Sequence, residues 1–170
     1  MVREPDRSLR EDAKAIFQAA VDRVMPQNLF SYCLAVDGDF LRVSDGTTGA
    51  AVTAYDLSLY THIVIAAFGK ASLPMATSFV STLGNRVSGG LVVTKAVDTK
   101  TVDAKAADGG QTPAGGQESL KAREFLAAHS IRVVEASHPV PDERSWSAAR
   151  EMFALADKVQ QWEARGEKTL

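Results

Sequence analysis

Residues 63–72 read IVIAAFGKAS, and this stretch decides the fold of the chain. An apolar run this short, ended by a glycine, is typical of a buried strand in an α/β sheet. Gly69 lets the chain turn sharply, and Lys70 follows at the carboxyl end of the strand. Open α/β sheets bind their ligands at that edge, where a lysine offers a cation to a phosphate or a carboxylate. The stretch therefore predicts both a buried strand and a candidate anion site.

Helical and extended patterns alternate on both sides of this strand. We expect an α/β fold, a Rossmann-like three-layer sandwich with a mostly parallel sheet, because strands that alternate with helices form parallel β-α-β units. A hairpin that turns at Asp37-Gly38-Asp39 is expected near the start of the chain. The expected helices cover about 8–25, 72–83, 120–129 and 145–163, and the further strands cover 34–36, 40–43, 89–95 and 131–135.

Several details of these helices can be compared with a structure. Pro26 is expected to stop the first helix, and Ser72 is expected to cap the second. The first and last helices each carry an apolar stripe at helical spacing, which is expected to face the core. The stripes consist of Ala13, Ile16, Phe17, Ala20, Val21 and Val24 in the first helix, and of Ala149, Met152, Phe153, Ala156 and Val159 in the last.

The composition places the chain among globular proteins. It has 170 residues, of which 45% are hydrophobic and 24% charged, and this is enough for one domain with a real core. A net charge of -2 gives no reason to expect a nucleic acid or an anionic membrane as partner. The single cysteine, Cys33, excludes an internal disulfide. Without a signal peptide or an apolar run of about 20 residues, we expect a cytoplasmic protein.

Two familiar nucleotide-binding motifs are absent from the sequence. A Walker A loop needs a glycine five residues before the Gly-Lys pair and a Ser or Thr after it, but Val64 and Ala71 occupy these places. A dinucleotide fingerprint needs three glycines at a defined spacing, which neither Gly69 nor the pair Gly89-Gly90 supplies. The sequence also indicates no metal-binding cluster.

Four polar residues near expected strand ends are candidates for a binding site. Lys70 either recognises an anion beside a helix N-terminus or is a solvated lysine, and both interpretations stay open. The same holds for His138, which lies between a strand and two prolines and is either a positioned donor or part of a turn. For Asp142 a helix N-cap is the favoured interpretation, and for Lys95 a solvated loop lysine.

Taken together, the motifs resemble the amino-terminal domain of D-glycerate 2-kinases of the MOFRL type, which older descriptions also call hydroxypyruvate reductases. The resemblance rests on residues 16–22, on Phe68-Gly69-Lys70-Ala71, on residues 89–95, and on Ser137-His138-Pro139-Val140-Pro141-Asp142. Their order and approximate spacing agree with the family over nearly the whole chain.

The resemblance implies a function and a set of site residues. The family transfers the γ-phosphoryl group of ATP, with Mg²⁺, to the 2-hydroxyl of glycerate, so glycerate and ATP are the implied ligands. The lysine of the Gly-Lys-Ala motif carries over to Lys70 as catalytic residue, with Gly69, Lys95, His138 and Asp142 as residues that bind substrate or nucleotide. Such a lysine would neutralise charge on the transferring phosphoryl group or orient the substrate.

The sequence also departs from the family pattern. The glycine-rich loop of the family is expected just after Leu170, and the carboxyl-terminal MOFRL domain is not present, so residues 1–170 correspond to a partial domain. Residues 98–118 are polar and are expected to form a flexible insertion. We therefore expect a chain that is inactive alone. The alternatives are a non-catalytic folded fragment that binds a small anion and forms a homo-oligomer through an exposed edge, or a hydroxypyruvate reductase.

Overall fold

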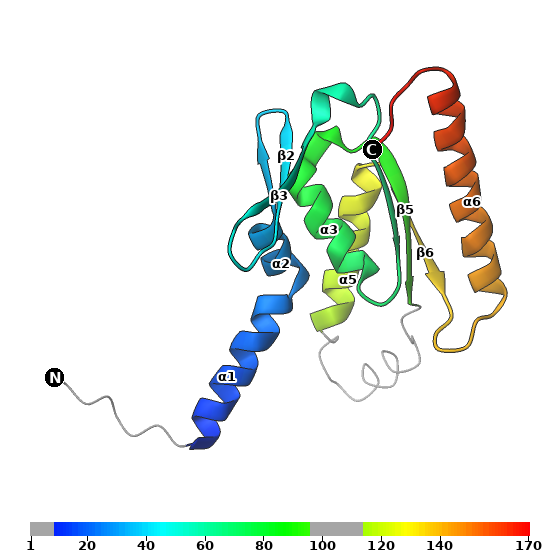
Figure 1. The fold of residues 1–170 in the computed structure, drawn as a ribbon. Helices are drawn as coiled ribbons and strands as arrows, with labels where there is room; N and C mark the ends of the chain where they lie inside the picture. Colours follow the sequence, from blue (N-terminus) through cyan, green and yellow to red (C-terminus); the bar gives the residue numbers. More distant parts are fainter. Residues whose placement is uncertain (1–8, 96–113) are drawn as a thin grey trace.

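The computed structural model describes residues 9–95 and 114–170, and the fold is drawn in Figure 1. Most of the expected insertion at 98–118 lies outside these residues, but its last five residues belong to a helix that begins at Ala114. In chain order the elements are α1 (Leu9–Val24), α2 (Pro26–Cys33), β1 (Leu34–Asp37), β2 (Phe40–Ser44), β3 (Ala51–Asp56), β4 (Val64–Phe68), α3 (Ser72–Leu83), β5 (Gly89–Lys95), α5 (Ala114–Ala128), β6 (Ile131–Ala136) and α6 (Glu143–Ala164), with short 3-10 turns at Leu57–Leu59 and Gly84–Arg86.

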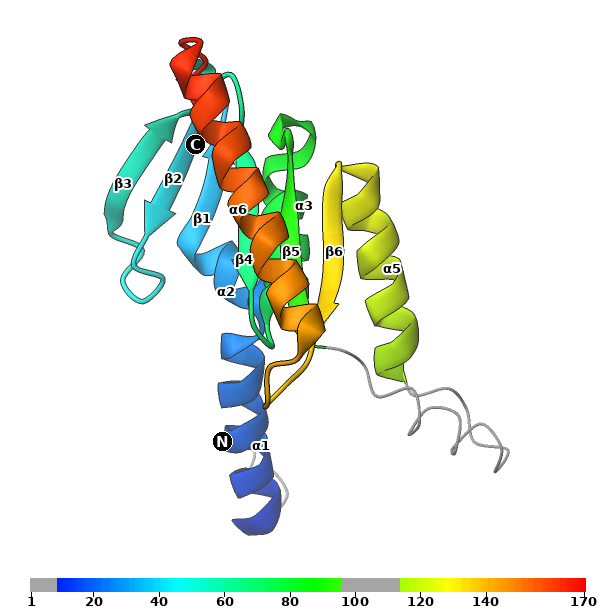
Figure 2. The same cartoon turned by 90° about the vertical axis from the view of Figure 1, so that its right-hand side faces the viewer.

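The main sheet has the strand order β4-β5-β6, and its strands are parallel. Helices α3 and α5 lie on one face of this sheet and α6 lies on the other, as the two views in Figures 1 and 2 show. The expected α/β fold with three layers is therefore confirmed. The strands predicted at 63–67, 89–95 and 131–135 all form, each within a residue or so of its predicted ends.

A second sheet is antiparallel and has the order β1-β2-β3. The predicted hairpin is confirmed, with Asp37 paired to Phe40 across a two-residue turn. Gly38 has a φ of +58°, a conformation that glycine adopts without steric cost. Strand β3 was not predicted, because its residues Ala51–Asp56 contain no continuous apolar run and bury no side chain fully.

The hydrophobic core lies on the α3/α5 face of the parallel sheet. Its fully buried side chains are Val80 and Leu83 from α3, Val92 from β5, Leu126 from α5 and Ile131 from β6. On the other face, α6 contributes Ala148 as its only buried residue. The expectation that Phe153 faces the core is wrong, since 72% of its surface is exposed. Helix α6 packs on β5 and β6 and leaves the adjoining part of the sheet open.

The first helices differ from the prediction in two ways. The first helix ends before Pro26 as predicted, but Pro26 also begins a second helix, α2, which was not predicted and in which its missing N–H costs no hydrogen bond. The apolar stripe of α1 is not buried, and Ile16 and Phe17 are 72% and 68% exposed. Figure 1 shows why, because α1 points away from the sheets and packs mainly against its neighbour α2.

Candidate functional site

The candidate residues gather at the carboxyl edge of the parallel sheet. Strand β4 ends at Phe68 and is followed by Gly69 and Lys70, while β5 ends at Lys95. Lys95 pairs in register with Ala136, the last residue of β6, two positions before His138. Because the three strands are parallel, the structure brings these exits to one edge, which is the lower end of the parallel sheet in Figure 2. This is the arrangement that the strand pattern predicts.

The turn after β4 is fastened to the neighbouring strand. Gly69 has a φ of +111°, which L-residues rarely adopt, and its N–H donates to Val93 O at 3.0 Å. The hydroxyl of Ser72 lies 2.8 Å from Gly69 O and 2.9 Å from Val93 O and shares its hydrogen between them. Ser72 is the first residue of α3 and not the predicted N-cap. Its buried hydroxyl joins the Gly69 turn to strand β5.

Sequence reasoning missed this role of Ser72 because it depends on which strand lies next to β4. The sequence feature that could have indicated this role is a small hydroxyl residue, Ser72, three positions after the glycine of the turn. Ala71 is the N-cap of α3 and offers no side-chain hydrogen bond, but Ser72 N–H donates to Gly69 O and Met75 N–H donates to Ala71 O. Lys70 thus lies next to a helix N-terminus, where the helix dipole favours an anion.

The side chains of Lys70, Lys95 and His138 are exposed. Across the described ranges, none of the three side chains takes part in a hydrogen bond or ion pair. The sheet therefore brings two amines and an imidazole to one edge without enclosing them. The peptide bond between His138 and Pro139 is cis.

Asp142 behaves as the helix N-cap that the sequence favours. One carboxylate oxygen accepts from the Arg144 N–H at 3.0 Å, and the other accepts from Arg144 Nε at 2.9 Å. The side chain of Ser145 completes a capping box with the Asp142 backbone. The Arg144 hydrogen bond lowers the pKa of Asp142 and raises that of Arg144. Both oxygens of Asp142 are thus engaged by its own helix.

An apolar hollow of about 310 Å³ adjoins the same edge on the α6 face. Phe68, Val93 and Ala136 line it from the three strands, and Ala148 and Phe153 line it from α6. On the opposite face, Arg123 of α5 pairs with Glu135 at 2.6 Å, next to the end of β6. This edge of the sheet therefore combines the exposed amines of Lys70 and Lys95, an apolar hollow, and carboxylates that are already paired with arginines.

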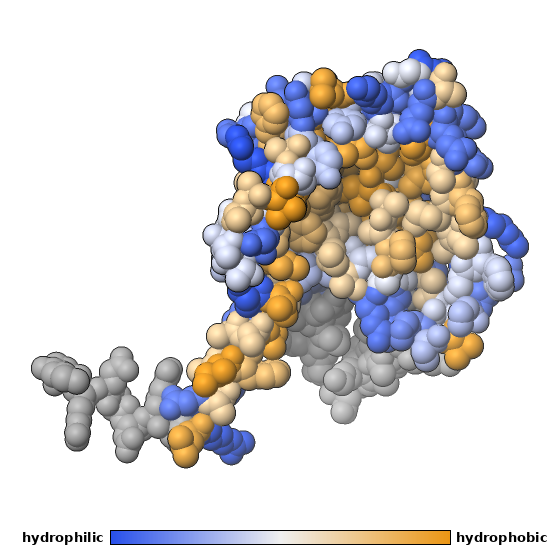
Figure 3. Space-filling model, in the orientation of Figure 1, coloured by the Kyte–Doolittle hydropathy of each residue, from blue (hydrophilic) through white to orange (hydrophobic). Residues whose placement is uncertain are grey.

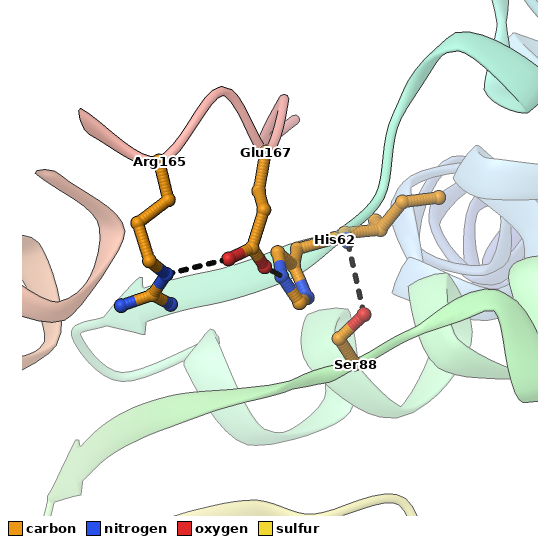
Figure 4. Close-up of polar contacts among 5 residues, drawn as sticks. His62, Ser88, Arg165 and Glu167 are labelled. Carbon is orange, nitrogen blue, oxygen red and sulfur yellow. Dashed lines mark hydrogen bonds and ion pairs between the residues drawn. The ribbon is translucent and has the colours of Figure 1, made fainter. Parts of the chain in front are cut away.

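A second polar cluster lies at the other end of β4 (Figure 4). His62 Nε2 is 2.6 Å from Glu167 Oε2, and Arg165 Nε donates to the other oxygen of Glu167 at 2.7 Å. The His62 ring stacks on Trp162 with the centroids 4.0 Å apart. Ser88 Oγ accepts from the Ile63 N–H and, among the residues that the structure describes, makes no hydrogen bond to His62.

The cluster therefore lacks the nucleophile of a catalytic triad. Hydrogen bonds from His62 and Arg165 lower the pKa of Glu167. Its geometry is that of a structural clamp between the end of α6 and the start of β4.

Neither a metal centre nor a membrane span is visible in the described part of the chain. Residues 9–95 and 114–170 hold no group of three or more His, Cys, Asp or Glu side chains that could bind an ion. Within the same residues, no helix combines the length and apolar character that crossing a bilayer requires.

The fold and the edge define an α/β protein with a parallel sheet and a candidate anion site where its strands end. The chain belongs to the family described as "Domain of unknown function (DUF4147)", whose model matches residues 12–164. No curated protein matches the chain.

Among solved structures, the chain is similar to the PH0495 protein from Pyrococcus horikoshii OT3, with 21% sequence identity and a TM-score of 0.56. The match covers 91% of this chain and 27% of that protein, so the chain spans about a quarter of the length of its solved relative. At this identity the likeness shows the fold alone.

Proposed function

We propose that this chain forms the amino-terminal α/β part of an ATP-dependent D-glycerate 2-kinase. The observation that carries the proposal is the turn at Gly69 and Lys70, which places an amine beside the N-terminus of α3 and next to the ends of β5 and β6. The resemblance of the Gly-Lys-Ala and His-Pro-Val-Pro-Asp motifs to that family supports the proposal, and so does membership of the DUF4147 family.

In this function Lys70 meets an oxyanion, either a phosphate of ATP or the carboxylate of glycerate. Phosphoryl transfer depends mainly on positioning and on neutralising charge, which a flexible amine can provide. Lys95 is a second cation at the same edge, and His138 is a donor on the neighbouring exit. Gly69 contributes the backbone conformation that directs the lysine outward.

Mg²⁺ would reach this edge on the phosphates of ATP and not at a protein site of its own. The two carboxylates next to the strand ends, Asp142 and Glu135, are already paired with Arg144 and Arg123. Magnesium commonly keeps several waters and binds through substrate phosphates with one or two carboxylates. We therefore assign no step of the reaction to a metal ligand of this chain.

The proposal includes binding without turnover by the 170-residue chain alone. Lys70 and His138 are exposed, so water screens their charges and would compete for a transferring phosphoryl group. Catalysis requires a surface that closes over this edge. Formation of 2-phosphoglycerate by the isolated chain would contradict this part of the proposal.

Calorimetric titration with Mg-ATP and with D-glycerate tests the binding site. Replacing Lys70 by Ala should weaken the binding of at least one ligand by about tenfold, since one charge-assisted contact in a solvated site is lost. Lys168→Ala is the matched control, because Lys168 is also exposed but lies at the opposite end of β4. Equal affinities of the wild-type chain and the Lys70→Ala variant would overturn the assignment of Lys70.

A second candidate function is that of a small-anion-binding module without catalysis. The open position of the Lys70 and Lys95 amines favours it, because no described residue around them selects one anion over another. Inorganic phosphate distinguishes the two functions. A module would bind phosphate as tightly as it binds glycerate or ATP, whereas a kinase domain would prefer its substrates.

A further inference from the structure

The apolar hollow beside α6 belongs to the same edge of the sheet as the exposed amines. Phe68, Val93 and Ala136 line it from β4, β5 and β6, and each of them lies at the end of its strand or two positions before it. Ala149 and Phe153 line it from α6. Figure 3 shows apolar side chains gathered in the hollowed centre of the molecule beside α6. The hollow is therefore continuous with the candidate anion site.

Lys95 leaves the sheet on the face that the hollow occupies. It lies two positions after Val93 on β5, and it pairs in register with Ala136 of β6. Alternate residues of one strand point to the same face, and so do paired residues of neighbouring strands. Two residues of a strand span about 6.6 Å, which is within the reach of a lysine side chain. Lys95 thus places a cation beside the apolar lining.

The carboxylates near the hollow are all engaged. Four of them lie within three positions of a residue that lines it, and each is paired with an arginine. The pairs are Glu135 with Arg123 at 2.6 Å, Asp142 with Arg144 at 2.9 Å, Glu143 with Arg150 at 4.0 Å and Glu151 with Arg132 at 3.1 Å. The amines at this edge are therefore the charged groups left to meet a ligand, which favours an anion with an apolar part.

The size and lining of the hollow favour a flat aromatic ring as that apolar part. Phe68 and Phe153 are 79% and 72% exposed, so both present ring surface on which a second ring can stack. The volume of about 310 Å³ lies at the lower limit of small-molecule pockets, which is roughly 300 Å³. Such a space suits one ring system and not a whole nucleotide.

A single hydroxyl in the lining adds a polar preference. Ser145 lines the hollow, and its Oγ accepts a hydrogen bond from the Asp142 N–H at 3.3 Å. Within residues 9–95 and 114–170 this hydroxyl donates no hydrogen bond, so its own hydrogen can go to an acceptor on a ligand. A heteroaromatic ring with a nitrogen acceptor therefore fits the hollow better than a hydrocarbon ring.

We infer that this hollow binds the purine base of ATP, while Lys95 and Lys70 meet the phosphates. The inference rests on the proposed function, which supplies a nucleotide as ligand. The base stacks against Phe68 or Phe153 and accepts a hydrogen bond from Ser145 Oγ at a ring nitrogen. The ribose spans the step from the hollow to the amines. Preference for a nucleotide over other phosphates thus comes from the hollow and not from the amines.

Calorimetric titration with Mg-ATP and with Mg-tripolyphosphate tests this inference. Both ligands carry three phosphates, but tripolyphosphate has neither ribose nor base. The wild-type chain should bind Mg-ATP at least about tenfold more tightly than Mg-tripolyphosphate, since stacking of a base adds to the phosphate contacts.

Two variants of α6 locate the base. Ala149→Leu fills the hollow, and the matched control Ala156→Leu fills a neighbouring hollow on the same helix, seven residues further along. We expect Ala149→Leu to lose the preference for Mg-ATP and to keep its affinity for Mg-tripolyphosphate. The control should bind both ligands as the wild-type chain does.

The outcomes separate this inference from the proposed function. Equal affinities of the wild-type chain for the two ligands would overturn the inference and leave the proposed function standing. If Ala149→Leu weakened the binding of both ligands equally, or of neither, the inference would also be wrong. If the wild-type chain bound neither ligand, the proposed function would fail and the inference with it.

NMR of the wild-type chain with Mg-ATP replaces the variant if Ala149→Leu does not fold. Nuclear Overhauser contacts are expected between the adenine protons and the methyl groups of Val93. Val159 lines the neighbouring hollow and serves as the control, for which no such contact is expected. The absence of contacts to Val93 would overturn the inference.

Discussion

Gly90 illustrates how strictly one residue can be fixed by a backbone neighbour. A Cβ added to Gly90 would lie 2.2 Å from Ile65 O, and the atom that it meets is a carbonyl of the paired strand β4. Gly69 differs, because a Cβ there meets nothing within 4 Å and only its φ of +111° requires glycine. Gly90 is therefore required by the lack of space for a side chain, and Gly69 by its backbone conformation.

Replacing Gly90 by Ala is therefore expected to destabilise the fold by about 1–3 kcal/mol, the usual cost of overpacking a core. The carbonyl of Ile65 cannot swing aside as a side chain would, so the two strands must separate locally. Urea unfolding of the wild-type and variant chains measures the change in the free energy of unfolding. An unchanged midpoint would mean that β4 and β5 can shift apart without cost.

Ser72→Ala tests the buried link below the Gly69 turn. Ser72 is 4% exposed and its hydroxyl serves two carbonyls, so we expect a loss of about 1 kcal/mol of unfolding free energy. Ser81→Ala is the matched control, since its hydroxyl bonds only to Thr77 O on the exposed side of the same helix. The control should stay within about 0.5 kcal/mol of the wild type. Equal effects of both variants would refute a special role for Ser72.

Among the elements, α6 depends strongly on its ends, because along its length it buries only Ala148 fully. At its N-terminus the Arg144 hydrogen bond lowers the pKa of Asp142. A carboxylate with a lowered pKa stabilises the fold above the ordinary Asp pKa, and this contribution is lost as the pH falls through the lowered value. We therefore expect the start of α6 to fray in acid.

The Asp142→Asn variant separates the cap from the charge. Asparagine is also a good N-cap, so this variant should keep the helix start at neutral pH but lose the acid-dependent part of its stability. The Asp142→Ala variant should fray at every pH. Amide exchange in the first turn of α6 between about pH 2.5 and 7 measures the difference. The same acid dependence in the wild type and in Asp142→Asn would exclude Asp142 as its source.

Elements were predictable from the sequence where one local signal decides them. The apolar runs of β4, β5 and β6 and the Asp37-Gly38-Asp39 turn each give such a signal, and the structure confirms them. The first helix stops before Pro26 as predicted, but α2 was not predicted, because the same residue that stops one helix can begin the next. The stripe of α6 was misread because periodicity shows that a face is apolar and does not show what covers it.

For the molecule as a whole, the strand pattern predicted the edge that gathers Lys70, Lys95 and His138, since parallel strands end on the same side. It could not predict the groups that meet through the tertiary fold. The pairing of Glu135 with Arg123, and the clamp between His62 and Glu167, join residues that are distant or on different elements. The open edge of β4 likewise depends on strand order, which periodicity does not contain.

The clamp makes the attachment of the last residues to β4 sensitive to acid. Hydrogen bonds from His62 and Arg165 lower the pKa of Glu167, so its stabilising effect is complete above the ordinary Glu pKa and is lost as the pH falls through the lowered value. We expect the amides of Val64 and Leu170, which donate to Leu170 O and His62 O, to lose protection in that range. Glu167→Gln should show faster exchange already at neutral pH and little further change in acid.

Arg144→Ala provides the control for this experiment. It removes an ion pair at the opposite end of α6 and should leave the amides of Val64 and Leu170 unchanged. Loss of protection in the Arg144→Ala variant as large as in Glu167→Gln would show that α6 responds as one unit and that the clamp has no local effect.

The unequal distribution of buried side chains between the two faces of the parallel sheet has a kinetic consequence. The α3/α5 face holds the fully buried residues, whereas the carboxyl end of α6 is fixed to the start of β4 only after a loop of about a hundred residues has closed between His62 and Glu167. Non-local contacts of this kind form late in folding. The carboxyl end of α6 should therefore attach last during refolding and detach first when the protein is pulled from its carboxyl end, before the rest of the molecule yields.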